Sequence, residues 1–194
     1  MSLLEQIVQL DERITLWVNG LPSVNSDPFW WALSDTKFWI PFYIAVLAFL
    51  IWKLGWKKGL IVALTVVLAV TCLDQFSNLI KNGVGRVRPC YNDWMNANGL
   101  RLPYGIVGGK YGFFSAHAGN TFAFAMASYL GLKWHSTGNT AKIYGWCVFT
   151  WAAFVSVSRL VMGAHFLGDI TVGAMVGVCF GAAWAWIARK VFRL

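Results

Sequence analysis

Charged residues are scarce in this chain of 194 residues. Asp, Glu, Lys and Arg together make up 12% of it, whereas hydrophobic residues make up 58%. A soluble domain usually has about a quarter charged residues, so this composition argues against a soluble protein. We expect a membrane protein, in which lipid surrounds the apolar side chains. The length is close to that of one domain, and apolar runs use most of it, which predicts a single membrane-embedded domain over residues 1–194.

Cysteine motifs and a signal peptide are also lacking. Three of the four cysteines lie in apolar runs and only Cys90 lies in a polar loop, so neither a disulfide framework nor a zinc site is predicted. The amino terminus lacks the basic start and the continuous apolar stretch of a cleaved signal, so we expect insertion through the chain's own spans. Nothing indicates nucleic acid, a cofactor or an obligate protein partner.

The amino-terminal region, residues 1–37, is amphipathic. From residue 3 to residue 21, apolar residues recur at helical spacing and polar residues occupy the other side. Asn19 and Gly20, followed by Pro22, end this helix. Such a helix is expected to lie along the membrane surface, and packing against the spans is the alternative. Residues 25–37 are interpreted as a connector that contains a short aromatic segment.

Five apolar runs follow, at residues 38–54, 59–80, 116–132, 143–162 and 166–188. Each approaches or exceeds the roughly 20 residues that cross the hydrocarbon core of a membrane. The predicted fold class is therefore all-α: a polytopic membrane helical bundle with about five transmembrane helices, plus the amino-terminal interfacial helix.

Five crossings sort the basic residues between two membrane faces. The connectors after the first and third spans share a face with the carboxyl terminus, and all eight acidic residues lie on or nearest to the other face. Of the 16 basic residues, eight lie on each face, or eight against five once Lys81, Arg88 and Arg159 are set aside for chemistry. By the positive-inside rule we expect the acid-free face in the cytoplasm and the other in the periplasm or exterior, as in a bacterial inner membrane protein.

Three polar clusters from separate parts of the chain fall on this second face. Lys81 and Arg88 follow the second span, Ser115 opens the third, and Arg159 closes the fourth. Ionisable groups at the membrane edge need partners or a wet cavity. Phosphate would be such a partner, because arginine offers a planar fork, lysine a compact charge, and the start of a helix free N–H groups. The net charge of +8 is then explained by topology and by phosphate binding.

Two histidines on the same face are candidates for catalysis. His165 and Asp169 are four residues apart at the start of the fifth span, so they share one helix face. Asp169 can then accept from one ring nitrogen of His165 and leave the other free as a nucleophile. His117 is suited to protonate the departing lipid alkoxide and then to activate water.

These residues carry a resemblance to a known family, the type 2 phosphatidic acid phosphatase superfamily. Its signature has the parts Lys-x6-Arg-Pro, Pro-Ser-Gly-His and Ser-Arg-x5-His-x3-Asp. The first part is complete in Lys81, Arg88 and Pro89, and the third is complete in Ser158, Arg159, His165 and Asp169. In the middle part, Phe114 and Ala116 stand where the family usually has proline and glycine.

The resemblance implies a metal-independent phosphatase with a phosphohistidine intermediate. His165 would be the nucleophile, Asp169 its orienting residue and His117 the general acid. Phosphate would be bound by Lys81, Arg88, Ser115 and Arg159. If the amide of Ala116 had to donate to phosphate from a positive-φ conformation, alanine would adopt it less readily than glycine.

The substrate stays open at this point. Candidate substrates are undecaprenyl diphosphate, phosphatidylglycerol phosphate, phosphatidic acid and a lipid A phosphate. The alternative functions are hydrolysis of a soluble phosphate ester, phosphotransfer to another lipid, and non-catalytic binding or carriage of an anionic lipid. Arg86, Arg101 and Lys110 are interpreted as loop cations that either steer an anionic head group or are simply solvated. Asp74 either faces Lys81 across two turns or pairs with another polar residue near the end of its span.

Overall fold

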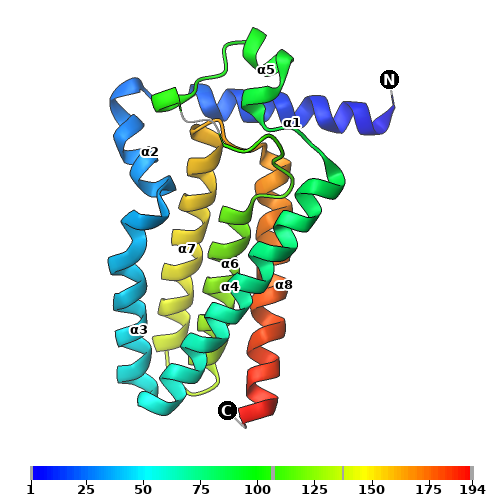
Figure 1. Ribbon diagram of the computed structural model, residues 1–194. Coiled ribbons are helices and arrows are strands. Elements are labelled where there is room, and N and C mark those ends of the chain that lie inside the picture. Colours follow the sequence, from blue (N-terminus) through cyan, green and yellow to red (C-terminus); the bar gives the residue numbers. More distant parts are fainter. Residues whose placement is uncertain (1, 106–107, 137, 193–194) are drawn as a thin grey trace.

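The computed structural model describes residues 2–105, 108–136 and 138–192, and these residues form an all-α bundle. Within this part of the chain, the one β-type pairing is an isolated antiparallel bridge between Val87 and Tyr111. Long helices run up and down between two ends, and a further helix lies across one end (Figure 1). The upright helices are α3 (Ile40–Leu54), α4 (Trp56–Val84), α6 (Ala116–Lys133), α7 (Thr140–Val161) and α8 (Leu167–Phe192). The predicted fold class is confirmed.

In the described part of the chain, four segments are long and apolar enough to cross a membrane: Thr36–Leu54, Trp56–Val84, Thr140–Val161 and Leu167–Phe192. The fifth predicted span, α6, is a helix but is less apolar. Its neighbours explain this, because α6 packs against α4, α7 and α8 and buries small residues such as Ala118 and Ala123. A helix surrounded by other helices needs close packing more than lipid-compatible side chains.

Glycines on α8 bring it close to α6, both near the polar clusters and further along the two helices. A Cβ atom at Gly173 would lie 2.6 Å from the carbonyl oxygen of Ser115, and one at Gly181 would lie 2.6 Å from that of Ala123. Larger residues would push the two helices apart. This close approach fixes the start of α6 beside the first turns of α8.

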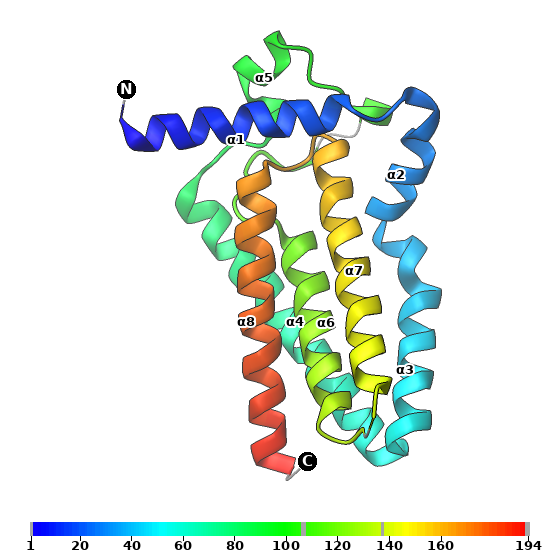
Figure 2. The ribbon, with the colours of Figure 1, turned by 180° about the vertical axis from the view of Figure 1, so that it is seen from behind.

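Short elements connect the long helices. The predicted connector 25–37 contains η1 (Val24–Ser26), α2 (Asp27–Ser34) and the start of η2 (Thr36–Trp39). Between α4 and α6 the chain forms η3 (Pro89–Tyr91), α5 (Asp93–Ala97) and η4 (Pro103–Gly105) over the same end as α1 (Figure 1). The α3–α4 turn, the α6–α7 connection and the carboxyl terminus lie at the opposite end, which confirms the predicted sorting of the loops (Figures 1 and 2).

Helix α1 (Leu3–Gly20) lies across the ends of α7 and α8 (Figure 2). Its polar side faces the bundle, because Thr15 and Asn19 are fully buried. Asn19 Nδ2 donates to the carbonyl of Val161 at 2.8 Å, and Thr15 Oγ1 accepts from the amide of Leu167 at 3.0 Å. The apolar stripe points outward and is exposed at Leu3, Ile7, Leu10, Trp17 and Leu21. One face therefore packs on the bundle, and the other is apolar as a helix at a membrane surface requires.

Candidate active site

All seven predicted site residues lie at the end of the bundle beneath α1. Lys81 is in the last turn of α4, Arg159 in the last turn of α7, and Asp169 in the first turn of α8. The other four lie in or next to the connecting segments: Arg88 before η3, Ser115 and His117 at the start of α6, and His165 in the turn between α7 and α8. The convergence expected from counting crossings is therefore present in the fold.

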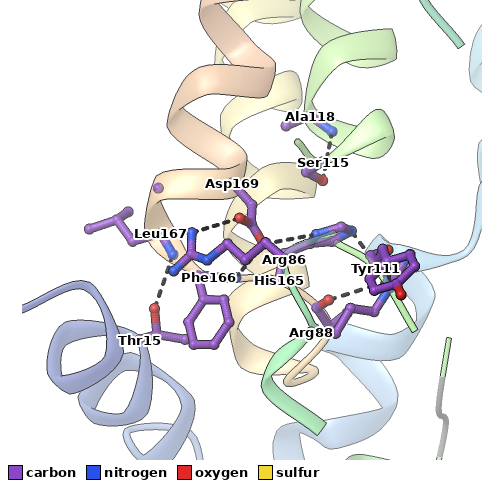
Figure 3. A network of polar contacts seen from close by, with 12 residues as sticks. Thr15, Arg86, Arg88, Tyr111, Ser115, Ala118, His165, Phe166, Leu167 and Asp169 are labelled. Atoms are coloured by element: carbon purple, nitrogen blue, oxygen red, sulfur yellow. Dashed lines mark hydrogen bonds and ion pairs between the residues drawn. The ribbon is translucent and has the colours of Figure 1, made fainter. Parts of the chain in front are cut away.

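His165 and Asp169 form a buried pair. His165 Nδ1 lies 3.4 Å from Asp169 Oδ2, and that oxygen also accepts from the amide of Phe166 at 3.1 Å. Their side chains are 1% and 0% exposed. With Nδ1 turned to the carboxylate, Nε2 points away from Asp169 (Figure 3). This is the orientation that a histidine nucleophile needs, with the opposite nitrogen held by an acid.

Arg88 lies on the other side of the ring. Its Nη1 is 3.3 Å from His165 Nε2 and donates at 3.3 Å to the carbonyl of Ala164, while its Nε donates at 3.3 Å to the carbonyl of Tyr111 (Figure 3). Burial, then the positive charges of Arg88 and Arg159, hold the pKa of His165 well below its usual range. The imidazole is therefore neutral at neutral pH and keeps a lone pair on one nitrogen.

Pairing of two loop segments sets the position of Arg88. The amide of Arg88 donates to the carbonyl of Lys110 at 3.0 Å, and the amide of Gly112 donates to the carbonyl of Arg86 at 2.9 Å. Gly112 lies directly against the site: a Cβ there would be 3.0 Å from Arg88 Cγ and 3.2 Å from Asp169 Oδ2. A side chain at this position would push against both groups, so the glycine permits the close approach.

A cavity of about 660 Å³ reaches this end of the bundle from between α3, α4 and α6. Lys81, Arg88 and His117 line one part of it. Most of the remaining lining is apolar, including Leu47, Leu50, Val66, Val67, Val70 and Phe124. Such a space combines a cationic site for phosphate with an apolar region for a hydrocarbon chain.

The predicted site residues do not all face this cavity. Among the described residues, Ser115, Arg159, His165 and Asp169 are absent from its lining. Arg88 both lines the cavity and, through Nη1, contacts His165 Nε2. The structure thus brings Lys81, Arg88 and His117 to the cavity, and Arg88 connects this lining to the His165–Asp169 pair.

Arg159 reaches toward α2. Its Nη1 donates to the hydroxyl of Ser34, a residue that also lines the cavity. Within the described residues, Nε of Arg159 has no hydrogen-bond partner. A buried guanidinium with a remaining donor is costly unless an anion completes its contacts.

Ser115 caps α6 and is fully buried. Its hydroxyl accepts from the amide of Ala118 at 3.4 Å, and its own amide donates to the carbonyl of Asp169 at 3.0 Å. The expected contact of Ser115 with phosphate stays a prediction. Ala116 begins the helix and is not among the positive-φ residues, so this fold asks for no glycine at that position.

Arg86 is a neighbour of the predicted site that the sequence did not reveal. It was interpreted as a steering or solvated cation, yet Nη1 donates to Asp169 Oδ1 at 2.8 Å and Nη2 donates to Asp11 Oδ2 at 2.7 Å. Its guanidinium also lies over the Phe166 ring, 4.2 Å from the centroid (Figure 3). Both carboxylate oxygens of Asp169 are therefore engaged, one by Arg86 and the other by His165 and the Phe166 amide.

Helix α1 contacts the first turn of α8, next to Asp169, from outside the bundle. Asp11 Oδ1 accepts from the amide of Gly168 at 2.8 Å, so Asp11 and Thr15 take up two free N–H groups of the first turn of α8. The sequence shows the polar stripe itself, since Asp11, Thr15 and Asn19 recur every fourth residue on one helix face, but not what the stripe faces.

The fold and site together define an all-α membrane protein with a histidine–aspartate pair beside a group of cations. A sequence profile described as the PAP2 superfamily matches residues 58–193. The chain belongs to the PAP2 superfamily, and it is a multi-pass membrane protein.

Individual relatives agree with this assignment. The chain is 30% identical over 192 residues to a lipid A 4′-phosphatase of Bacteroides thetaiotaomicron, covering 97% of this chain and 81% of that protein. It is 32% identical over 180 residues to a lipid A 4′-phosphatase of Porphyromonas gingivalis, covering 92% and 72%. The crystal structure of a transmembrane PAP2-type phosphatidylglycerolphosphate phosphatase from Bacillus subtilis has a TM-score of 0.74 at 17% identity, covering 96% of this chain and 88% of that one. This last likeness concerns the fold alone.

Proposed function

We propose that this protein hydrolyses a phosphate monoester or diphosphate of a lipid through a phosphohistidine at His165. The observation that carries the proposal is the buried His165–Asp169 pair in contact with Arg88, which lines the cationic part of an otherwise apolar cavity. A lipid phosphate matches this arrangement, because its head group needs cations and its chain needs apolar walls.

In the first step the phosphate of the lipid meets Lys81, Arg88 and the remaining donor of Arg159. Arg88 turns from His165 to the phosphoryl oxygens, which opens Nε2 to the phosphorus atom. The Nε2–P bond forms while the bond between phosphorus and the lipid oxygen breaks, and His117 gives its proton to the departing alkoxide. Asp169 stabilises the positive charge that develops on the imidazole.

In the second step His117, now unprotonated, takes a proton from water. The water oxygen attacks phosphorus, the Nε2–P bond breaks, and inorganic phosphate leaves with the histidine restored. Lys81, Arg88 and Arg159 stabilise the charge of both transition states, which is the work that a metal ion does in other phosphatases. The proposed mechanism needs no metal and no cofactor.

The relatives bear on the choice of substrate. Two of them are lipid A 4′-phosphatases, so we place a lipid A phosphate first among the four candidate lipids. For the location, we propose that the end of the bundle with the site faces the periplasm and that the opposite, acid-free end faces the cytoplasm of a bacterial inner membrane.

A phosphate-release assay tests this proposal. Purified protein in detergent is supplied with the four lipids and with soluble phosphate esters, in wild type and in His165→Ala. We expect release from at least one lipid, little release from the soluble esters, and no turnover by the variant although it still binds the lipid. Release by His165→Ala at the wild-type rate would contradict the mechanism. Binding of lipid without any release by the wild type would favour a carrier instead.

A further inference from the structure

A polar pair lies in the cavity at some distance from the cations. Asp74 on α4 and Asn120 on α6 both line the cavity, and Asn120 Nδ2 donates to Asp74 Oδ1 at 3.2 Å. Asp74 precedes Lys81 by seven residues, and Asn120 follows His117 by three. At a rise of about 1.5 Å per residue, the pair lies roughly 5–10 Å further along the two helices than the phosphate site.

Structural roles do not account for this pair. Within the described residues, Asp74 forms no ion pair with Lys81 or any other cation, and Asn120 Oδ1 is buried without a hydrogen-bond partner. Hydroxyls elsewhere in the lining are used differently, since Thr121 and Ser128 donate to carbonyls of their own helix. An acidic side chain inside a membrane protein is costly and usually marks a functional position.

Asp74 offers a hydrogen-bond acceptor to the cavity. Its side chain lines the cavity, and the one hydrogen bond found for it in the described part of the chain goes to Oδ1, so the carboxyl group keeps acceptor capacity. Asn120 holds this carboxyl group through Nδ2, while its own Oδ1 is buried. A ligand group that completes the contacts of Asp74 must donate a hydrogen bond. Hydrocarbon has no donor, so a plain prenyl or acyl chain leaves the carboxyl group without a ligand partner.

We propose that Asp74 and Asn120 form a subsite that accepts hydrogen bonds from a hydroxyl or an amide N–H of the lipid substrate. The inference rests on the proposed function and narrows its substrate class. The distance from the cations places the donor on the lipid backbone or on the first atoms of a chain. The subsite favours amide-linked or hydroxylated lipid phosphates over prenyl diphosphates and over glycerolipids that are esterified only.

Two matched lipids test the subsite. Ceramide 1-phosphate and phosphatidic acid are both two-chain phosphate monoesters, but the first carries an amide N–H and a hydroxyl near the phosphate, and the second carries esters at those places. We compare kcat/KM for the two lipids in wild type, in the double variant Asp74→Leu/Asn120→Leu, and in Ser128→Ala. Ser128 is a matched control because it lines the same cavity but donates within its own helix.

Wild type should prefer ceramide 1-phosphate by about tenfold or more, since a hydrogen bond to a charged group contributes that much to discrimination. The double variant should lose the preference and keep its rate on phosphatidic acid within about threefold, while Ser128→Ala keeps both. Asp74→Asn retains the shape of the side chain and one acceptor, so we expect it to keep part of the preference for ceramide 1-phosphate. It also serves as the test variant if the double variant does not fold.

The outcomes separate the two proposals. Equal kcat/KM values for both lipids in wild type, or a preference unchanged in Asp74→Asn and in the double variant, would overturn the subsite alone. Failure of wild type to release phosphate from any lipid would overturn the proposed function, and the subsite with it.

Discussion

Arg86 gives the sharpest test of how the histidine–aspartate pair is held. The change Arg86→Gln removes two hydrogen bonds to carboxylates, at 2.8 Å to Asp169 and 2.7 Å to Asp11. A hydrogen bond to a charged group contributes about 1.5–3 kcal/mol. The Arg86 side chain is 23% exposed, so solvent screens part of this, and we take about 1.5–2 kcal/mol for the bond to Asp169. That energy corresponds to a fall in kcat of roughly 10- to 30-fold.

The position of Arg86 decides which kinetic constant should change. It contacts the carboxylate that orients His165, and within the described residues it is absent from the cavity lining, so kcat should fall while KM changes little. Arg86→Lys should lie between wild type and Arg86→Gln, because one ammonium replaces a fork that reaches two carboxylates. The measurements are steady-state kinetics in detergent and the melting temperature of each variant.

The control is Arg101→Gln. Arg101 is also a half-buried arginine of the same connecting segment, and it holds Asp27 at 2.9 and 3.0 Å without touching the catalytic pair. We expect Arg101→Gln to lower the melting temperature and to keep kcat near the wild-type value. If both variants lose kcat in proportion to stability, the assignment of Arg86 as a positioning residue is refuted.

The remaining predictions concern Gly112, the pKa of His165 and the proposed independence of metal ions. Gly112→Ala places a Cβ against Arg88 and Asp169 and should lower kcat, whereas Gly109→Ala, with nothing within 4 Å of its Cβ, should not; equal kinetics would refute the crowding argument. Burial and neighbouring cations lower the pKa of His165, so its neutral form persists below the usual 6.5 and phosphoenzyme should still form quickly at about pH 6. Arg88→Gln removes a cation, raises that pKa and should shift the acid limb of the phosphoenzyme rate to higher pH; an unmoved limb would count against this assignment. EDTA should leave phosphate release nearly unchanged, and strong inhibition reversed by added metal would contradict the metal-independent mechanism.

The end of the bundle that carries the site could be predicted because it depends only on the number of crossings. Each crossing reverses the direction of the chain, so Lys81, Ser115 and His165 had to arrive at one end. The spacing of His165 and Asp169 likewise needs only one helical turn. The character of α6 was harder to predict, because a central helix is packed by small residues and its hydropathy is lower than that of lipid-facing helices.

Two features could not be obtained from the sequence. An apolar stripe on an amphipathic helix faces either protein or lipid, and the pattern is the same in both cases; in α1 the polar stripe with Asp11 faces the protein. The partner of Arg86 depends on how residues 86–88 pair with residues 110–112, which are distant in the sequence and carry no local signal of their register. Arg86 was therefore interpreted as a loop cation, and its carboxylate partner was not predicted.

The most direct test of the central claim is to trap the phosphoenzyme. Wild-type protein is mixed with a lipid substrate labelled in its phosphate and quenched in alkali, in which a phosphohistidine survives. We expect label on His165, stable to base and lost in acid, and no label in His165→Ala. Label on another residue, or equal labelling of His165→Ala, would contradict it.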